Sequence, residues 1–88
     1  MIALRLSVHG RVQGVFYRNW TVNTARQLGL AGWVRNCPDG TVAAHLEGEE
    51  PVVRRMIELM HSGPPNARVD HIDLEECAPE HFATFDRR

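Results

Sequence analysis

The change in the spacing of apolar residues across Gly10 and Gly14 most constrains what this chain can fold into. Before the two glycines, apolar and more polar residues alternate from Ile2 to Val8, which is typical of a half-buried strand. After them, from about Phe16 to Leu28, apolar residues recur at helical spacing, and Gly29 stands where a helix C-cap glycine belongs. The first third of the chain therefore predicts a strand, a tight turn and a helix.

The remaining residues predict a second helix and further strands. Pro51 suits the first turn of this helix, and Gly63 followed by two prolines ends it. Alternation and turn residues predict strands over 31–36, 41–47 and 69–76, with a short edge strand within 81–88.

This order, β-α-β-β-α-β, predicts an α+β fold of the ferredoxin-like type in one domain spanning residues 1–88. Both helices carry an apolar stripe, so we expect them to cover one face of an antiparallel sheet of four to five strands. Right-handed crossovers would place the third strand between the first and second. The first two strands would then be parallel, and their C-terminal ends would share one edge.

The composition limits the chemistry and the location. Apolar residues make up 43% of the chain and the formal net charge is −1; all ten basic residues are arginine, which excludes a Schiff-base lysine. The N-terminus lacks the pattern of a signal peptide, and no apolar run is long enough to span a membrane. We therefore expect a cytoplasmic protein without a membrane partner, in which Cys37 and Cys77 are free thiols.

The segment from Gly10 to Arg18 is the candidate binding site. A glycine turn before a helix can direct several N–H groups at one anion, and an arginine beside it can hold a phosphate with two hydrogen bonds. Asn36 ends the second strand at the same predicted edge, and its amide can hold a water molecule. Since neither side chain is a strong acid or base, an acyl phosphate, whose carboxylate leaves unaided, fits best. On these residues alone, a plain turn without a ligand is the favoured explanation of the segment.

Other sites are disfavoured by spacing. The five histidines stand apart from one another in the sequence and predict no metal site. A thiol phosphatase needs an arginine six residues after its cysteine, where Ala43 and Ala83 stand instead. Trp20 and Trp33 are expected to pack in the core or at its rim, and the outward positions of the central strands lack the aromatics of an RNA-binding sheet, so no nucleic acid is expected.

Two segments resemble the signatures of the acylphosphatase family. Gly10-Arg-Val-Gln-Gly-Val-Phe-Tyr-Arg18 is similar to the first, and Leu28-Gly-Leu-Ala-Gly-Trp-Val-Arg-Asn36 followed by Asp39-Gly-Thr-Val42 is similar to the second. Gly63-Pro-Pro-Asn-Ala-Arg-Val69 resembles the family's approach to its fourth strand. Cys37 and the segment from His81 to Arg88 depart from the family's pattern.

The resemblance implies a monomeric enzyme without cofactor or metal that hydrolyses the carboxyl–phosphate bond of a small-molecule acyl phosphate. By position, Arg18 would bind the phosphate and Asn36 would orient the attacking water. The loop that binds the substrate would comprise Arg11, Val12, Gln13, Gly14, Val15, Phe16 and Tyr17. The alternative is a non-catalytic module that binds acyl or carbamoyl phosphate, since similar domains open larger carbamoyl-phosphate-handling proteins.

Overall fold

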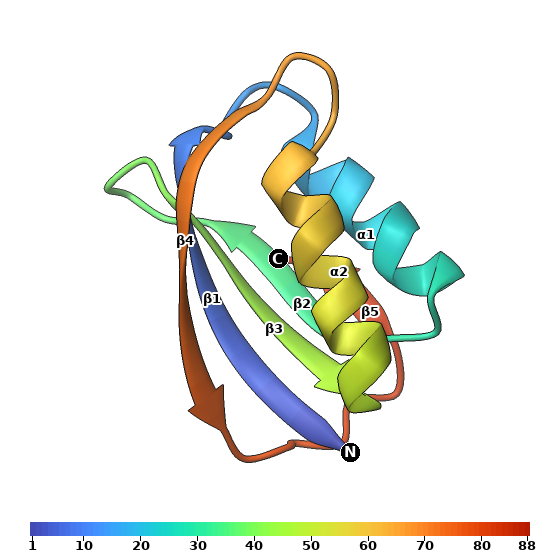
Figure 1. Cartoon of the computed structure of the whole chain (residues 1–88). Helices are drawn as coiled ribbons and strands as arrows, with labels where there is room; N and C mark the ends of the chain where they lie inside the picture. Colours follow the sequence, from blue (N-terminus) through green and yellow to red (C-terminus); the bar gives the residue numbers. More distant parts are fainter.

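The computed structural model describes residues 1–88 and contains five strands and two helices (Figure 1). In chain order they are β1 (Ile2–Arg11), α1 (Tyr17–Gln27), β2 (Ala31–Asn36), β3 (Val42–Gly48), α2 (Glu50–Ser62), β4 (Arg68–Cys77) and β5 (Phe85–Arg87). Each predicted element is present.

The strands form one sheet in the order β4-β1-β3-β2-β5, and both helices cover the same face of it (Figure 1). The third strand lies between the first and second, as right-handed crossovers predict. The pairs β4–β1, β1–β3 and β3–β2 are antiparallel, whereas β5 is parallel to β2 and makes the sheet mixed. After β4 the chain crosses below the sheet and returns beside β2 in the same direction, which explains this one parallel pair (Figure 1).

The core lies between the sheet and the two helices. The inward residues of β1 and β3 are almost completely buried, and each helix contributes one buried stripe. Phe85 on the short edge strand is fully buried in the same cluster. The stripe residues are Tyr17, Thr21, Val22 and Ala25 of α1, and Val53, Met56, Ile57 and Met60 of α2.

Trp33 lies outside this core, on the open face of the sheet. It is buried because three guanidinium groups cover its ring: those of Arg5, Arg35 and Arg88, at 4.9, 5.4 and 5.0 Å from the ring centroid. Trp20, by contrast, packs against the core as expected. Guanidinium stacking on an indole face explains how a large aromatic can be buried on the side without helices.

Neither helix is both long enough and apolar enough to cross a membrane.

Candidate active site

The loop after β1 and the end of β2 lie at the same edge of the sheet (Figure 1). Val8 of β1 and Asn36 of β2 both pair with Val42 of β3, from opposite sides. The two strands are therefore parallel, and Asn36 at the C-terminal end of β2 is level with Val8, shortly before β1 ends at Arg11. This is the juxtaposition that the predicted topology requires.

The β1–α1 loop, residues 12–16, is anchored by two buried valines and leaves its backbone donors free. Val12 and Val15 point into the core, whereas Gly14 and Phe16 have positive φ angles of 74° and 71°. No N–H group of the β1–α1 loop donates a hydrogen bond to another protein group. Backbone donors without acceptors in a turn before a helix are suited to an anion.

Gln13 fastens this loop to the β2–β3 turn. Its Nε2 donates to the carbonyl oxygens of Cys37 and Thr41, at 2.8 and 2.9 Å. Since Cys37 directly follows Asn36, this side chain joins the two halves of the candidate site. The sequence predicted that Gln13 lies in the loop but did not predict these two hydrogen bonds. They depend on which turn the fold places opposite the β1–α1 loop.

Arg18 is the second residue of α1, at the helix end that favours negative charge. The residue is partly buried, and its guanidinium makes no ion pair or hydrogen bond with the protein. The helix has no side-chain cap and no acidic residue in its first turn. A fixed cation and a helix N-terminus therefore stand together without a protein counter-charge.

The other residues of the candidate loop have distinct places. Tyr17 is a core residue whose hydroxyl donates to the carbonyl of Met60 at 2.7 Å, and burial raises its pKa strongly. Its side chain cannot reach a ligand at the loop, so only its N–H group is available there. Arg11 is exposed and ends β1 opposite Arg68 of β4.

Asn36 carries the one buried side-chain oxygen or nitrogen in the chain that lacks a hydrogen-bond partner, its Oδ1. A buried acceptor without a donor costs free energy and calls for an explanation by function or by a bound water. This oxygen is an acceptor at the edge where the free donors and Arg18 lie. The arrangement can hold a water molecule beside a bound anion.

No general acid stands in the β2–β3 turn. Asp39 accepts hydrogen bonds from the hydroxyl and the N–H of Thr41, at 2.6 and 3.0 Å, and these bonds lower its pKa. It is therefore a carboxylate at neutral pH. The leaving group of a substrate bound at this edge must therefore depart without a proton from the β2–β3 turn.

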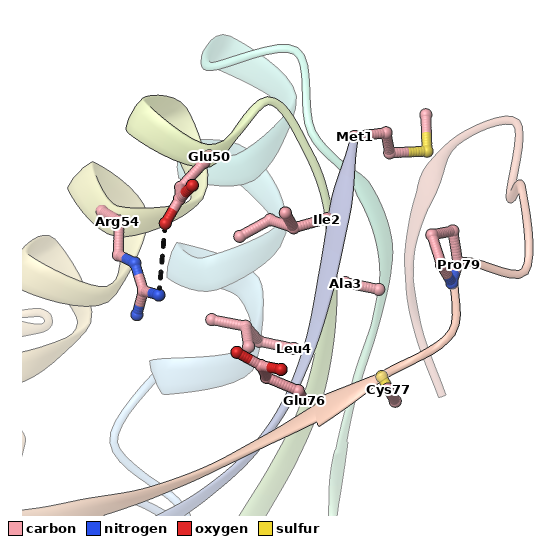
Figure 2. Close-up of a pocket in the computed structure, with 9 residues that line it drawn as sticks. All are labelled: Met1, Ile2, Ala3, Leu4, Glu50, Arg54, Glu76, Cys77 and Pro79. Atoms are coloured by element: carbon pink, nitrogen blue, oxygen red, sulfur yellow. Dashed lines mark hydrogen bonds and ion pairs between the residues drawn. The ribbon is translucent and has the colours of Figure 1, made fainter.

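Two hollows lie elsewhere on the molecule. One, of about 280 Å³, lies at the opposite end of β1, between Ile2, Cys77 and the Glu50–Arg54 ion pair (Figure 2). The other, of about 290 Å³, lies on the open sheet face beside Trp33. Burial raises the pKa of the Cys77 thiol, which argues against a nucleophile in the first hollow.

Both cysteines are free, as predicted. One group of side chains suited to a metal ion, His9, His71 and Asp73, lies on the open face of the sheet and outside the loop.

The two helices on one face of the five-stranded sheet define an α+β domain of the ferredoxin-like fold, in which the glycine turn, Arg18 and Asn36 lie at one sheet edge. The model of the acylphosphatase family matches residues 4–87, and the chain belongs to this family.

Relatives and solved structures agree with the assignment. The chain is 54% identical to the acylphosphatase of Rhodospirillum rubrum over 78 residues, which cover 89% of this chain and 86% of that protein. It is 48% identical to the acylphosphatase of Trichormus variabilis over 98% of this chain and 85% of that protein. The crystal structure of acylphosphatase from Bacillus subtilis is similar with a TM-score of 0.97 at 35% identity, over 100% and 99% of the two chains.

A larger protein contains a similar domain. Full-length HypF, in a phosphate- and nucleotide-bound form, matches 99% of this chain with 12% of its own length, at 26% identity and a TM-score of 0.88.

Proposed function

We propose that this chain is an acylphosphatase that hydrolyses acyl phosphates to a carboxylate and inorganic phosphate. The observation that carries the proposal is the buried, unpartnered Oδ1 of Asn36 at the edge where the unpaired Arg18 and the β1–α1 loop also lie. The reaction needs an acceptor for the attacking water and donors for the phosphoryl oxygens, and this edge offers both.

In the binding step, the phosphoryl group lies in the curve of the loop. The free N–H groups of residues 12–17 and the guanidinium of Arg18 donate to its oxygens, while Arg11 adds positive charge at the rim. These donors stand ready before the substrate arrives, so they stabilise the charge that spreads over the oxygens during transfer without reorganisation. Gln13 holds the loop in this shape through its two hydrogen bonds.

In the chemical step, a water molecule donates a hydrogen bond to Asn36 Oδ1 and attacks phosphorus opposite the acyl oxygen. The new P–O bond forms as the bond between phosphorus and the acyl oxygen breaks, and the carboxylate leaves with the electron pair. The water proton passes to an oxygen of the substrate's own phosphoryl group, because an amide does not accept a proton near neutral pH. No protein acid is needed for a carboxylate leaving group.

Turnover of benzoyl phosphate without added metal tests the proposal. We expect Arg18→Ala and Asn36→Ala each to lower kcat/KM by about 100-fold or more, since each removes a preorganised contact to the transition state worth about 3 kcal/mol. Arg55→Ala and Asn23→Ala are matched controls, because both residues are exposed on helix surfaces away from this edge. Turnover by the Arg18 or Asn36 variant at the level of its control would refute the assigned role.

The second candidate, a binding module, is favoured by one observation, the similar domain within HypF. Calorimetric binding of inorganic phosphate together with no hydrolysis of benzoyl phosphate would select this alternative. Hydrolysis that depends on Arg18 would exclude it.

We further propose that the chain acts as a monomer in the cytoplasm. Its two free cysteines lie at opposite ends of the sheet, Cys37 after β2 and Cys77 beside Ala3, so neither is positioned for a disulfide with the other. Light scattering coupled to gel filtration checks the oligomeric state.

A further inference from the structure

We propose that His9, His71 and Asp73 form a binding site for a divalent transition-metal ion, with Zn²⁺ as the best match, on the open face of the sheet. The three side chains come from two neighbouring strands, β1 and β4, and each can offer one ligand atom to a common point. This site is separate from the proposed acyl phosphate site and does not depend on it.

The pairing of β1 with β4 creates the cluster. His9 and His71 are direct partners in this antiparallel pair, and their rings stack with centroids 4.1 Å apart and 13° between planes. Asp73 stands two residues beyond His71, so its side chain lies on the same face of the sheet. Two imidazoles and a carboxylate are thus adjacent, although His9 is more than 60 residues from the other two in the sequence.

The distances are close to those of a zinc site. His9 Nε2 lies 2.9 Å from Asp73 Oδ2, His71 Nε2 lies 3.7 Å from the same oxygen, and the three ligand atoms all lie within 4.8 Å of one another. Ligands at about 2.0–2.2 Å from a tetrahedral Zn²⁺ are separated by about 3.3–3.6 Å. The observed separations bracket this range, so rotation of exposed side chains is enough to reach it.

The donor set selects the kind of ion. Two imidazole nitrogens with one carboxylate oxygen suit Zn²⁺ and its transition-metal neighbours, whereas Mg²⁺ and Ca²⁺ prefer oxygen ligands. The side chains of His9, His71 and Asp73 are 34%, 59% and 67% exposed, so an ion has access from solvent and keeps an open coordination position. Three exposed ligands predict exchangeable binding rather than a permanent structural metal.

Titration of the full chain with Zn²⁺ in competition with a chromophoric chelator at neutral pH tests the proposal. We expect one ion to bind per chain, with affinity reduced about tenfold or more by His71→Ala, which removes a direct ligand, and by Asp73→Asn, which replaces a charged ligand with a neutral one. His61→Ala is the control, since His61 is exposed on α2 and should leave the affinity unchanged. Circular dichroism and benzoyl phosphate turnover establish that the exposed variants fold.

Two further readouts distinguish this site from binding elsewhere. Because the ligands meet only in the folded chain, Zn²⁺ should raise the Tm of the natural protein and not that of His71→Ala. With Co²⁺ as the probe, a thiolate charge-transfer band would place the ion on Cys37 or Cys77 and overturn the proposal. Equal affinity in all variants, or no binding by the natural protein, would overturn it as well.

Discussion

At the scale of the residue, two carboxamides at the same sheet edge have opposite hydrogen-bonding states. The Nε2 of Gln13 is fully engaged, since it donates to both Cys37 and Thr41. The Oδ1 of Asn36 is buried and has no donor. The first state is typical of a group that holds structure, and the second of a group kept free for a ligand.

We expect Gln13→Leu to weaken both the fold and the site. The change keeps much of the side-chain volume, and each carbonyl oxygen keeps one backbone donor, but two hydrogen bonds are removed, which should lower the free energy of unfolding by about 1–3 kcal/mol. KM for benzoyl phosphate should rise because the β1–α1 loop is no longer held against the β2–β3 turn. Urea unfolding and steady-state kinetics measure both effects.

Gln27→Leu is the matched control, because Gln27 is exposed at the end of α1. If the Gln13 and Gln27 variants behaved alike in stability and KM, Gln13 would have no bracing role.

At the scale of the element, a bulge near the end of β1 sets the direction in which the β1–α1 loop leaves the strand. The register between β1 and β4 shifts between His9 and Gly10, and Gly10 has a φ of 132°. A Cβ atom built at Gly10 would lie 2.1 Å from the carbonyl oxygen of Arg68, whereas one at Gly14 would meet nothing within 4 Å. The bulge therefore requires glycine for space as well as for its positive φ, and the loop requires it for conformation alone.

Alanine substitutions should separate these two requirements. We expect Gly10→Ala to lower the free energy of unfolding by about 3 kcal/mol or more, because the pairing of β1 with β4 must open to admit the methyl group. Gly14→Ala should cost only about 1–2 kcal/mol, the strain of a left-handed alanine. Chemical denaturation of both proteins measures the difference. Similar losses at the two positions would show that the close approach to Arg68 is relieved at little cost.

At the scale of the whole molecule, Glu47 connects the sheet to the segment that crosses below it. Its buried carboxylate accepts hydrogen bonds from the N–H groups of Glu80 and Phe82 and from His45 Nε2, the latter at 2.8 Å. Burial alone raises the pKa of Glu47, but these hydrogen bonds lower it more, so its pKa is below the ordinary value. The carboxylate thereby fixes the path that leads from β4 to β5.

We expect this carboxylate to make the fold sensitive to acid. Because the pKa of Glu47 is lower in the folded chain than in the unfolded one, its contribution is complete above the unfolded pKa of about 4.3 and is lost as pH falls through the folded value. Glu47→Gln should therefore be less stable than the natural protein at pH 7, and the gap should narrow below about pH 4. Urea unfolding across this pH range measures the gap. A gap that stayed constant with pH would contradict the role of the ionised carboxylate.

The sequence predicted most of the fold because its elements are locally encoded. Period-two and helical spacing, with glycine and proline at the boundaries, identified the strands and helices, and the order of elements implied the sandwich and its shared edge. It likewise predicted which segments approach that edge, although the roles of Arg18 and Asn36 there remain predictions. The parallel edge strand was the least determined element, because Phe85 is buried only by packing across the sheet.

What depended on tertiary structure was every feature that joins distant residues on one surface. The bridge from Gln13, the guanidinium cover of Trp33 and the cross-strand cluster of His9 with His71 all arise from strand register and from which loop lies opposite which. Local spacing in the sequence predicts which face of a strand and which stripe of a helix is buried, because both follow from backbone geometry within a few residues. Contacts between strands depend on register, which is set only when the whole core is packed.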